Sequence, residues 1–323
     1  MASVIRVLTE HGVGGGAVEC HPTWRPRSTV ADARLVASCA RALLRMGPGQ
    51  VAHVHLSERG SFLREGALLA LAHRRGLVTV ATIHGASFVP FARKHPRLVS
   101  TVLRRADLIT CLDRQTLDIV RRSAPDARSE LLPNPALIED DVPPVDQTGE
   151  LVVFAGEIGL RKGADVLARA WPAVARRRPN ARCLMVGPAT DLVPPSAERL
   201  QLRAAVGPAE MRRILREARV IALPARAEGM PMILTEAMSL GRPFVSTPVG
   251  GIPELAEAGG MLVPVDDEAA LADRLTDLLA DAGLARTIGE RGRRFCLQTR
   301  SIEVIDARLR ELYSAAGRRQ PAT

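Results

Sequence analysis

Short apolar runs alternate with amphipathic stretches along almost the whole chain of 323 residues. Turn-forming residues flank the runs, which is typical of buried parallel strands. The alternation of strands with helices predicts an α/β fold in which helices cover parallel sheets. We predict strands at Val51–Leu56, Leu77–Ile83, Asp107–Cys111, Leu151–Ala155, Arg182–Val186, Val220–Leu223 and Phe244–Ser246. Helical spacing occurs at Ala31–Arg45, Phe62–Arg75, Arg114–Arg122, Gly163–Arg178 and Ser301–Ala316.

The alternation of strands and helices is interrupted once, in the segment PNPALIEDDVPPVDQTG at residues 133–149. This segment holds four prolines and four acidic residues. Such a composition predicts an interdomain linker, and the chain is long enough for two α/β cores. We expect an N-terminal domain over 1–140, a linker at 141–149 and a second domain over 150–300. A helix and tail follow at 301–323.

The composition excludes several classes of protein. No apolar run approaches the roughly 20 residues that span a bilayer, so we expect a cytoplasmic location. The five cysteines are scattered, which predicts buried, reduced thiols rather than a zinc or disulfide framework. Aromatic residues make up only 3% of the chain. That low share argues against a base-stacking platform, so we expect no nucleic-acid partner.

The positive charge of the chain is concentrated in its first half. Residues 1–140 hold 19 Lys and Arg against 12 Asp and Glu. An anionic partner, such as lipid headgroups or a phosphorylated acceptor, is one interpretation, and a solvated Arg-rich surface is the other. The stretch ARKHPRLVSTVLRR at 92–105 could form a basic interfacial helix on an anionic membrane, or an ordinary amphipathic helix packed on its domain.

The most informative stretch lies between Val220 and Leu240, where a strand runs through a short loop into a helix that begins near Pro231. Free N–H groups at residues 230–233 make the start of this helix a site for a diphosphate. Glu236 suits ribose hydroxyls, and Glu228 can accept hydrogen bonds from a sugar. The alternative is that Glu228 caps the helix and Glu236 is a surface charge.

Two further loops follow predicted strands. VFAGEIGLRKG at 153–163 delivers Arg161 and Lys162 to the start of a helix, where two cations can clamp a pyrophosphate. GGIPE at 250–254 allows close backbone approach through its glycines, although a plain tight turn explains it as well. We expect His53 and His55 to point to opposite faces of their strand, which argues against a shared metal site.

Taken together, these segments resemble the retaining glycosyltransferases of family 4. The match covers most of residues 50–316 and is strongest at 151–265. The family signature is two glutamates separated by seven residues, here Glu228 and Glu236 within EGMPMILTEAMSLGRPFVSTPVGGIPEL. LLPNP at 131–135 is similar to the family's domain boundary, and HVHLSERGSFLREG at 53–66 and TIHGASF at 82–88 to its N-terminal domain. The resemblance implies the GT-B fold, with two facing Rossmann-like domains and an interdomain cleft.

The resemblance also implies a role for each matching residue. Glu236 would bind the donor ribose, Glu228 the transferred sugar, and Lys162 the leaving diphosphate. His84 would face the donor sugar across the cleft. The residues expected in catalysis are Lys162, Arg161, Glu228 and His84. Those expected to bind substrate are Glu236, Gly229, Met230, Pro231, Met232, Val206, Gly207, Gly250 and Gly251, with Val206 and Gly207 near the base.

One residue departs from the family pattern. The family usually has arginine after the glycine that matches Gly156, and this chain has Glu157. Arg161 could supply the missing charge; otherwise diphosphate binding is weakened.

The resemblance implies transfer of a hexosyl group from a nucleoside diphosphate sugar with retention at the anomeric carbon. The acceptor is unidentified; a lipid-linked or cell-surface glycan precursor is one class. We expect no cofactor and no metal. Two alternatives stay open, namely a catalytically weak or non-enzymatic relative and a sugar-nucleotide epimerase of similar fold.

The N-terminus departs from a GT-B opening of strand, glycine-rich loop and helix. In MASVIRVLTEHG the residues Val4, Val7 and Leu8 share one helical face, and Gly12 is a natural stop. We prefer this helix to a strand at Val4–Leu8 followed by a loop at Gly12–Gly16. The preference implies a missing first strand.

Overall fold

The computed structural model describes residues 2–12, 14, 18–24, 29–191 and 197–318. The chain forms two compact units. Unit 1 comprises Met1–Pro135 and Ile302–Thr323, and unit 2 comprises Ala136–Ser301. Most of the proline-rich segment that predicted a linker, from Ala136 onward, therefore belongs to unit 2, and the last helix of the chain returns to unit 1.

Unit 1 is built on a four-stranded parallel sheet whose spatial order, β1-β2-β3-β4, follows the sequence. Its strands are β1 (Val51–Leu56), β2 (Val78–Ile83), β3 (Leu108–Cys111) and β4 (Ser129–Leu131). Three of them lie where the apolar runs predicted strands. Because successive side chains point to opposite faces, both faces of this sheet carry apolar residues and both are covered.

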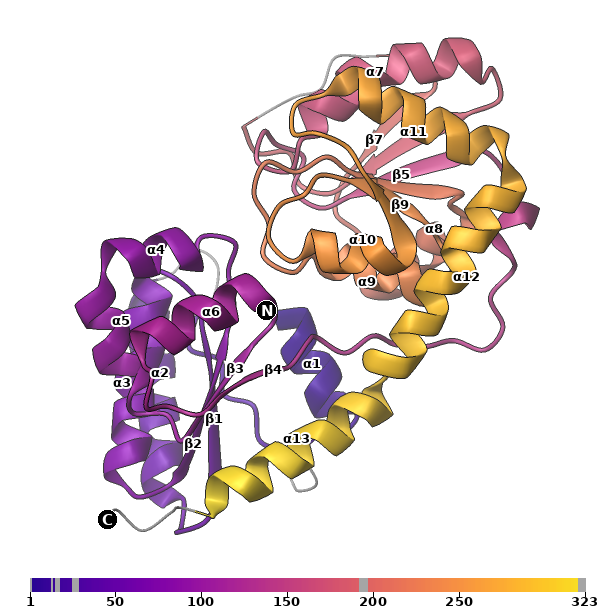
Figure 1. The fold of residues 1–323 in the computed structure, drawn as a ribbon. Coiled ribbons are helices and arrows are strands. Elements are labelled where there is room, and N and C mark those ends of the chain that lie inside the picture. Colours follow the sequence, from indigo (N-terminus) through magenta and orange to yellow (C-terminus); the bar gives the residue numbers. More distant parts are fainter. Residues whose placement is uncertain (1, 13, 15–17, 25–28, 192–196, 319–323) are drawn as a thin grey trace. The chain divides into compact units, whose positions relative to one another are not determined.

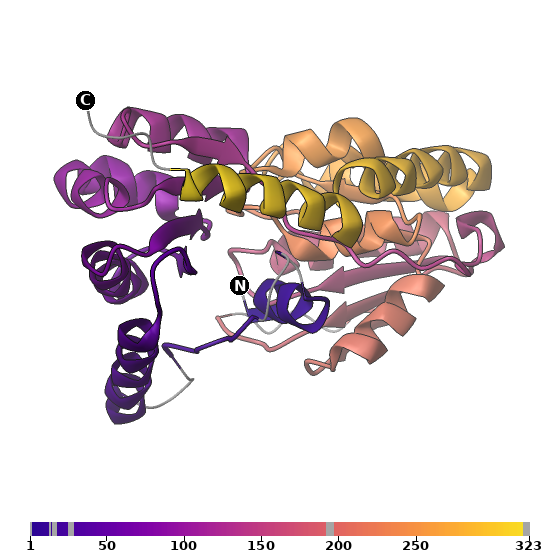
Figure 2. The same ribbon diagram turned by 90° about the horizontal axis from the view of Figure 1, so that it is seen from below.

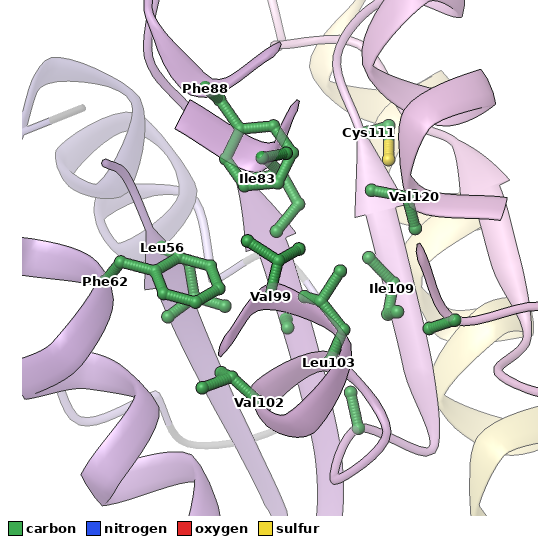
Figure 3. Close-up of a cluster of buried hydrophobic side chains, with 14 of the residues drawn as sticks. Leu56, Phe62, Ile83, Phe88, Val99, Val102, Leu103, Ile109, Cys111 and Val120 are labelled. Carbon is green, nitrogen blue, oxygen red and sulfur yellow. The ribbon is translucent and has the colours of Figure 1, made fainter. Parts of the chain in front are cut away.

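Two sets of helices cover the two faces of this sheet (Figure 1). On one side, Ile83, Ile109 and Cys111 pack against side chains such as Phe62 and Val99, and Figure 3 shows this cluster. The helices there are α3 (Gly60–Arg74), α4 (Phe88–Lys94), α5 (Pro96–Leu103) and α6 (Arg114–Ser123), with α2 (Thr29–Arg45) beside α3. On the other face, α13 (Ile302–Gly317) places Ile305, Leu309 and Leu312 against Val80 and Leu108.

The basic stretch at 92–105 is not one continuous helix. It breaks at His95 into α4 and α5, because Pro96 can open a helix but cannot continue the preceding one. Val99, Val102 and Leu103 are buried in the core of unit 1. These apolar side chains therefore pack inside unit 1 and are not available to insert into a membrane, which supports the interpretation of an amphipathic helix packed on its domain.

The first residues of the chain form the expected helix, α1 (Ala2–Glu10). Figures 1 and 2 both show this segment as a helical ribbon. The helix is followed by Gly12 with φ 59°, a left-handed conformation that suits glycine. Val4 is buried and Leu8 packs beside α13. The alternative strand at Val4–Leu8 is therefore wrong, while residues 13, 15 and 16 of the alternative loop lie outside the described residues.

Unit 2 contains a six-stranded parallel sheet in the order β10-β9-β8-β5-β6-β7. The strands are β5 (Leu151–Ala155), β6 (Arg182–Val186), β7 (Leu200–Arg203), β8 (Val220–Leu223), β9 (Phe244–Ser246) and β10 (Gly260–Leu262). Sequence patterns missed β4, β7 and β10, and all three lie at sheet edges. An edge strand is less enclosed than a central one, so it needs no continuous apolar run.

Helices also cover both faces of the sheet in unit 2 (Figure 1). One layer contains α7 (Ala164–Arg177) and α11 (Glu268–Ala280), which pack on each other. The opposite layer contains α9 (Met232–Ser239), α10 (Ile252–Gly259) and α12 (Ala282–Thr299). The remaining helices are α8 (Pro208–Glu217) and the short 3₁₀ helix η1 (Val145–Gln147).

A fully buried arginine anchors the proline-rich segment to unit 2. The Arg242 guanidinium donates to the carbonyl oxygens of Pro143 at 2.8 Å and Arg216 at 2.6 Å. We expect Arg242→Leu to lower the free energy of unfolding by about 2–4 kcal/mol, because each buried carbonyl left without a donor costs about 1–3 kcal/mol. Urea denaturation measures this. The control Arg213→Leu, on an exposed side chain of α8, should leave the free energy of unfolding nearly unchanged, and an equal loss in both variants would contradict the anchoring role.

Candidate functional site

The candidate site of unit 2 lies at the carboxyl edge of its sheet. Strands β5, β8 and β9 are parallel neighbours, so the loops that follow them emerge at the same edge. The chain runs from β5 toward β6 and β7 on one side and from β8 toward β9 and β10 on the other. The order of strands therefore reverses between β5 and β8, and ligands of open α/β sheets bind at such a switch point.

The loops after β5 and β8 bring together the charged residues predicted from sequence. Lys162 Nζ forms an ion pair with Glu228 Oε1, and Arg161 Nη1 lies 3.3 Å from the same oxygen. The Glu228 side chain is only 8% exposed, whereas that of Arg161 is 41% exposed. One carboxylate thus pairs with two cations and balances only one of their two positive charges. An anionic ligand can compete with Glu228 for both of them.

Glycines allow the third loop to approach this cluster closely. Gly250 has φ 56°, and a Cβ there would lie 2.1 Å from the carbonyl oxygen of Glu228. The next residue, Gly251, donates its N–H to the carbonyl oxygen of Gly229 at 2.7 Å. The glycine pair of GGIPE therefore packs against the Glu228–Gly229 backbone. The two glycines allow the two loops to approach each other closely, in addition to forming a turn.

Arg226, which the sequence patterns did not predict, stabilises the loop that carries Arg161 and Lys162. Arg226 donates to both carboxylate oxygens of Asp165, at 2.8 and 2.7 Å, and forms an ion pair with Asp266 at 2.6 Å. Its own N–H donates to the carbonyl oxygen of Arg161 at 2.9 Å. Hydrogen bonds from Arg226 lower the pKa of Asp165 to about 2. The only sequence signal was an arginine shortly after a strand and an aspartate in the first turn of a helix.

The other predicted substrate-binding residues take up defined positions. Met230 and Pro231 are buried just before α9, with Pro231 as its N-cap, so the helix begins one residue later than predicted. Glu236 is half-buried within α9. Val206 and Gly207 lie between β7 and α8, and β6 separates the edge strand β7 from β5 in the sheet.

His84, the fourth predicted catalytic residue, belongs to unit 1. It is buried directly after β2, and its Nε2 lies 2.8 Å from His55 Nδ1. His53 and His55 stack with ring centroids 4.5 Å apart. The expectation that they point to opposite faces is wrong, because residues two apart in a strand share a face. Within the described residues, no group of three or more His, Cys, Asp or Glu is arranged to hold a metal ion.

Comparison with known proteins identifies the family. A family model described as "Glycosyl transferases group 1" matches residues 149–281. A GDP-mannose-dependent alpha-(1-6)-phosphatidylinositol monomannoside mannosyltransferase of Mycolicibacterium smegmatis is 32% identical over 293 residues, covering 77% of this chain and 73% of that protein. The chain belongs to the group 1 glycosyl transferases. Membership places it among enzymes of the transferase class.

Other group 1 relatives match over shorter regions. A D-inositol 3-phosphate glycosyltransferase of Segniliparus rotundus is 30% identical over 162 residues, covering 46% of this chain and 36% of the relative. The chain spans between about a third and a half of the length of the inositol phosphate glycosyltransferases that it matches.

Solved structures agree on the GT-B fold. The sucrose-phosphate synthase of Thermosynechococcus elongatus superposes with a TM-score of 0.71 at 20% identity, covering 94% of this chain and 81% of that one. Anabaena Alr3699/HepE in complex with UDP and glucose gives 0.70 at 17% identity, covering 96% and 89%. No helix within the described parts of the chain is long and apolar enough to cross a membrane.

Glu157, which stands where the sequence resemblance implies an arginine, lies beside Arg161. Its carboxylate pairs with Arg161 Nη2 at 3.1 Å and accepts a hydrogen bond from Thr190 Oγ1 at 3.2 Å. Glu157 therefore reduces the positive charge that Arg161 offers to an anion.

We expect Glu157→Gln to tighten binding of a nucleoside diphosphate by about 1.5–5-fold, the modest effect typical of a partly exposed charge pair. Calorimetric titration at low and high salt measures the change, which should shrink as salt screens it. The control Glu217→Gln alters a carboxylate of similar charge that pairs on α8 instead. If both variants bind like the wild type, Glu157 does not modulate the site.

Proposed function

We propose that this chain is a retaining glycosyltransferase that moves a hexosyl group from a nucleoside diphosphate sugar to a hydroxyl of an acceptor. The observation that carries the proposal is the convergence of Lys162, Arg161 and Glu228 at the switch point of unit 2. A diphosphate needs two cations within reach, and a transferred sugar needs a hydrogen-bond acceptor beside them. The neighbouring start of α9 adds free N–H groups.

In the proposed reaction the bond between the anomeric carbon and the phosphate oxygen breaks, and a bond to the acceptor oxygen forms on the same face. The acceptor's proton passes to the leaving phosphate oxygen. Lys162 and Arg161 stabilise the negative charge that develops on the leaving group, which is electrostatic preorganisation. Glu228 accepts hydrogen bonds from hydroxyls of the transferred sugar, and Glu236 accepts them from hydroxyls of the ribose. His84 of unit 1 faces the donor sugar.

The relatives suggest which donors to test first. The mannosyltransferase of M. smegmatis is named as GDP-mannose-dependent, and the Anabaena protein is described with UDP and glucose. We propose GDP-mannose and UDP-glucose as the first candidates. The acceptor we propose is a lipid-linked or cell-surface glycan precursor, by analogy with the phosphatidylinositol monomannoside in the name of the mannosyltransferase.

A lipid-linked acceptor would require contact with a membrane surface. Arg93, Lys94, Arg97 and Arg104 are exposed on α4, on α5 and at the end of α5, and we propose that they attract anionic headgroups without insertion of an apolar face. Co-sedimentation with vesicles that contain about a third phosphatidylserine should fall steeply between 50 and 300 mM salt, roughly as expected for screened charges. Equal binding to neutral vesicles, or none, would contradict this contact.

The function is tested in two steps. A panel of nucleotide sugars is screened for thermal stabilisation, because a ligand that binds only the folded state raises the melting temperature. The stabilising donor is then incubated with acceptors, and release of nucleoside diphosphate is measured. Release together with a glycosylated product supports the proposal. Donor binding without turnover favours a catalytically weak relative, and conversion of the donor sugar without release favours an epimerase.

Calorimetric titration with the nucleoside diphosphate alone tests the ribose assignment. Glu236→Ala should weaken binding of the nucleoside diphosphate itself, since the ribose is present whether or not a sugar is attached. Unchanged affinity in calorimetric titration would remove Glu236 from the donor site.

A further inference from the structure

The histidine cluster of unit 1 contains a contact that sequence patterns did not predict. His55 lies on β1 and His84 directly after β2, and the two strands pair in parallel with His55 opposite Thr82. The His84 N–H extends this ladder by donating to the carbonyl oxygen of Leu56 at 2.7 Å. The pairing of the strands brings His55 Nδ1 to within 2.8 Å of His84 Nε2. From these contacts we infer that His55 is a positioning residue that fixes the ring orientation and the tautomer of His84.

The hydrogen bond between the two rings holds a single proton. A neutral imidazole carries a hydrogen on one nitrogen and a lone pair on the other. When one ring donates in this contact, the other must accept, so the tautomer of each ring depends on that of its neighbour. The nitrogen of His84 outside the contact, Nδ1, is then set as either a donor or an acceptor toward a substrate.

The ring of His55 is itself held in place. His53 stacks on it, with an interplanar angle of 20°. Both nitrogens of His53 are bonded, Nδ1 to Tyr313 Oη and Nε2 to Thr82 Oγ1, each at 2.6 Å. Thr82 Oγ1 in turn lies 2.6 Å from Thr110 Oγ1. A chain of contacts therefore connects α13 to His84 through the sheet, and such supporting contacts narrow the orientations of a functional ring.

The space beside these rings is too small for a sugar. A cavity of about 20 Å³, lined by His53, His55, His84 and Asn134 among others, has room for about one water molecule or hydroxyl group. His55 therefore supports His84 from behind rather than binding a hexose itself. This inference rests on the proposed role of His84 in glycosyl transfer, so its test needs one readout that does not depend on turnover.

Three variants of His55 separate positioning from packing. The amide of His55→Asn can occupy the place of Nδ1, the amide of His55→Gln reaches only toward Nε2, and His55→Phe keeps a ring without nitrogen. We expect kcat to fall about 10–100-fold in the Phe and Gln variants with little change in KM, in the range typical of lost supporting contacts. The Asn variant should retain most of the activity, and His73→Gln, on an exposed histidine of α3, serves as the control.

Nitrogen NMR of the histidine rings supplies the readout that is independent of activity. We expect one tautomer of His84 in the wild type and the Asn variant, and a changed or mixed tautomer in the Phe and Gln variants. An unchanged His84 signal in the Phe or Gln variant would overturn the inference, as would an Asn variant as altered as the Gln variant. If no donor supports turnover, the proposed function fails while the NMR comparison still decides the role of His55.

Discussion

Replacing Lys162 by alanine is expected to lower kcat by about 10²–10³-fold, the largest loss that we predict for any single substitution. The ammonium group pairs with Glu228. In the proposed reaction it exchanges this partner for the leaving phosphate, whose negative charge grows in the transition state. A preorganised donor of this kind contributes most when charge develops, so its removal lowers kcat more than it raises KM.

The measurement is release of nucleoside diphosphate under saturating donor. The matched control is Arg176→Ala, which removes an exposed cation near the end of α7, the helix that follows the Lys162 loop. The control should retain wild-type kcat, and both variants should keep their melting temperatures within a few degrees. Wild-type turnover in Lys162→Ala would remove Lys162 from the mechanism.

Mild acid is expected to destabilise unit 1 selectively. Burial lowers the pKa of His53 to about 4 and that of His84 to about 3, and it lowers the pKa of His55 well below the usual range. In the unfolded chain these rings titrate near pH 6.5. Between about pH 6.5 and pH 4 the unfolded state therefore binds protons that the folded state does not. Stability is full above this window and falls as the pH drops, by roughly tenfold in the unfolding equilibrium per pH unit for each histidine.

The distribution of residues offers an internal control for this prediction. All seven histidines of the chain lie before residue 96, so unit 2 has none. Trp171 is fully buried in unit 2, and Trp24→Phe makes it the sole tryptophan. On lowering the pH from 7.5 to 4.5, circular dichroism should lose helical signal while Trp171 fluorescence stays native. His73→Gln should not change the transition. Simultaneous loss of both signals, or no transition above pH 4.5, would contradict the assignment to the buried histidines.

The positions of central strands follow directly from apolar runs. Leu151–Ala155 and Val220–Leu223 match the central strands β5 and β8 to the residue. Such strands are buried on both faces, and burial requires the continuous apolar composition that a pattern search detects. The edge strand β7 has largely exposed side chains. Because little of β7 is buried, it carries no continuous apolar run that a local pattern could detect.

In the candidate site, too, the sequence predicted some features and the tertiary structure alone revealed others. Residue types and spacing alone predicted that Lys162, Arg161 and Glu228 would follow strand ends, and the parallel sheet places them at one edge because its strands run in one direction. The partners that hold them did not follow from spacing. Arg226 meets Asp165 across 61 positions of sequence, and His55 meets His84 across 29.

The sequence by itself therefore determined the alternation of strands with helices, the positions of the central strands, the family and the loops that carry charge, because each depends on residues close together in the chain. Only the tertiary structure decided which cations share Glu228, that the apolar side of α5 belongs to the core, and that His53 and His55 stack on one face of β1. Those outcomes depend on how strands align and how helices pack, and the energy of such contacts comes from residues that meet only when the chain is folded.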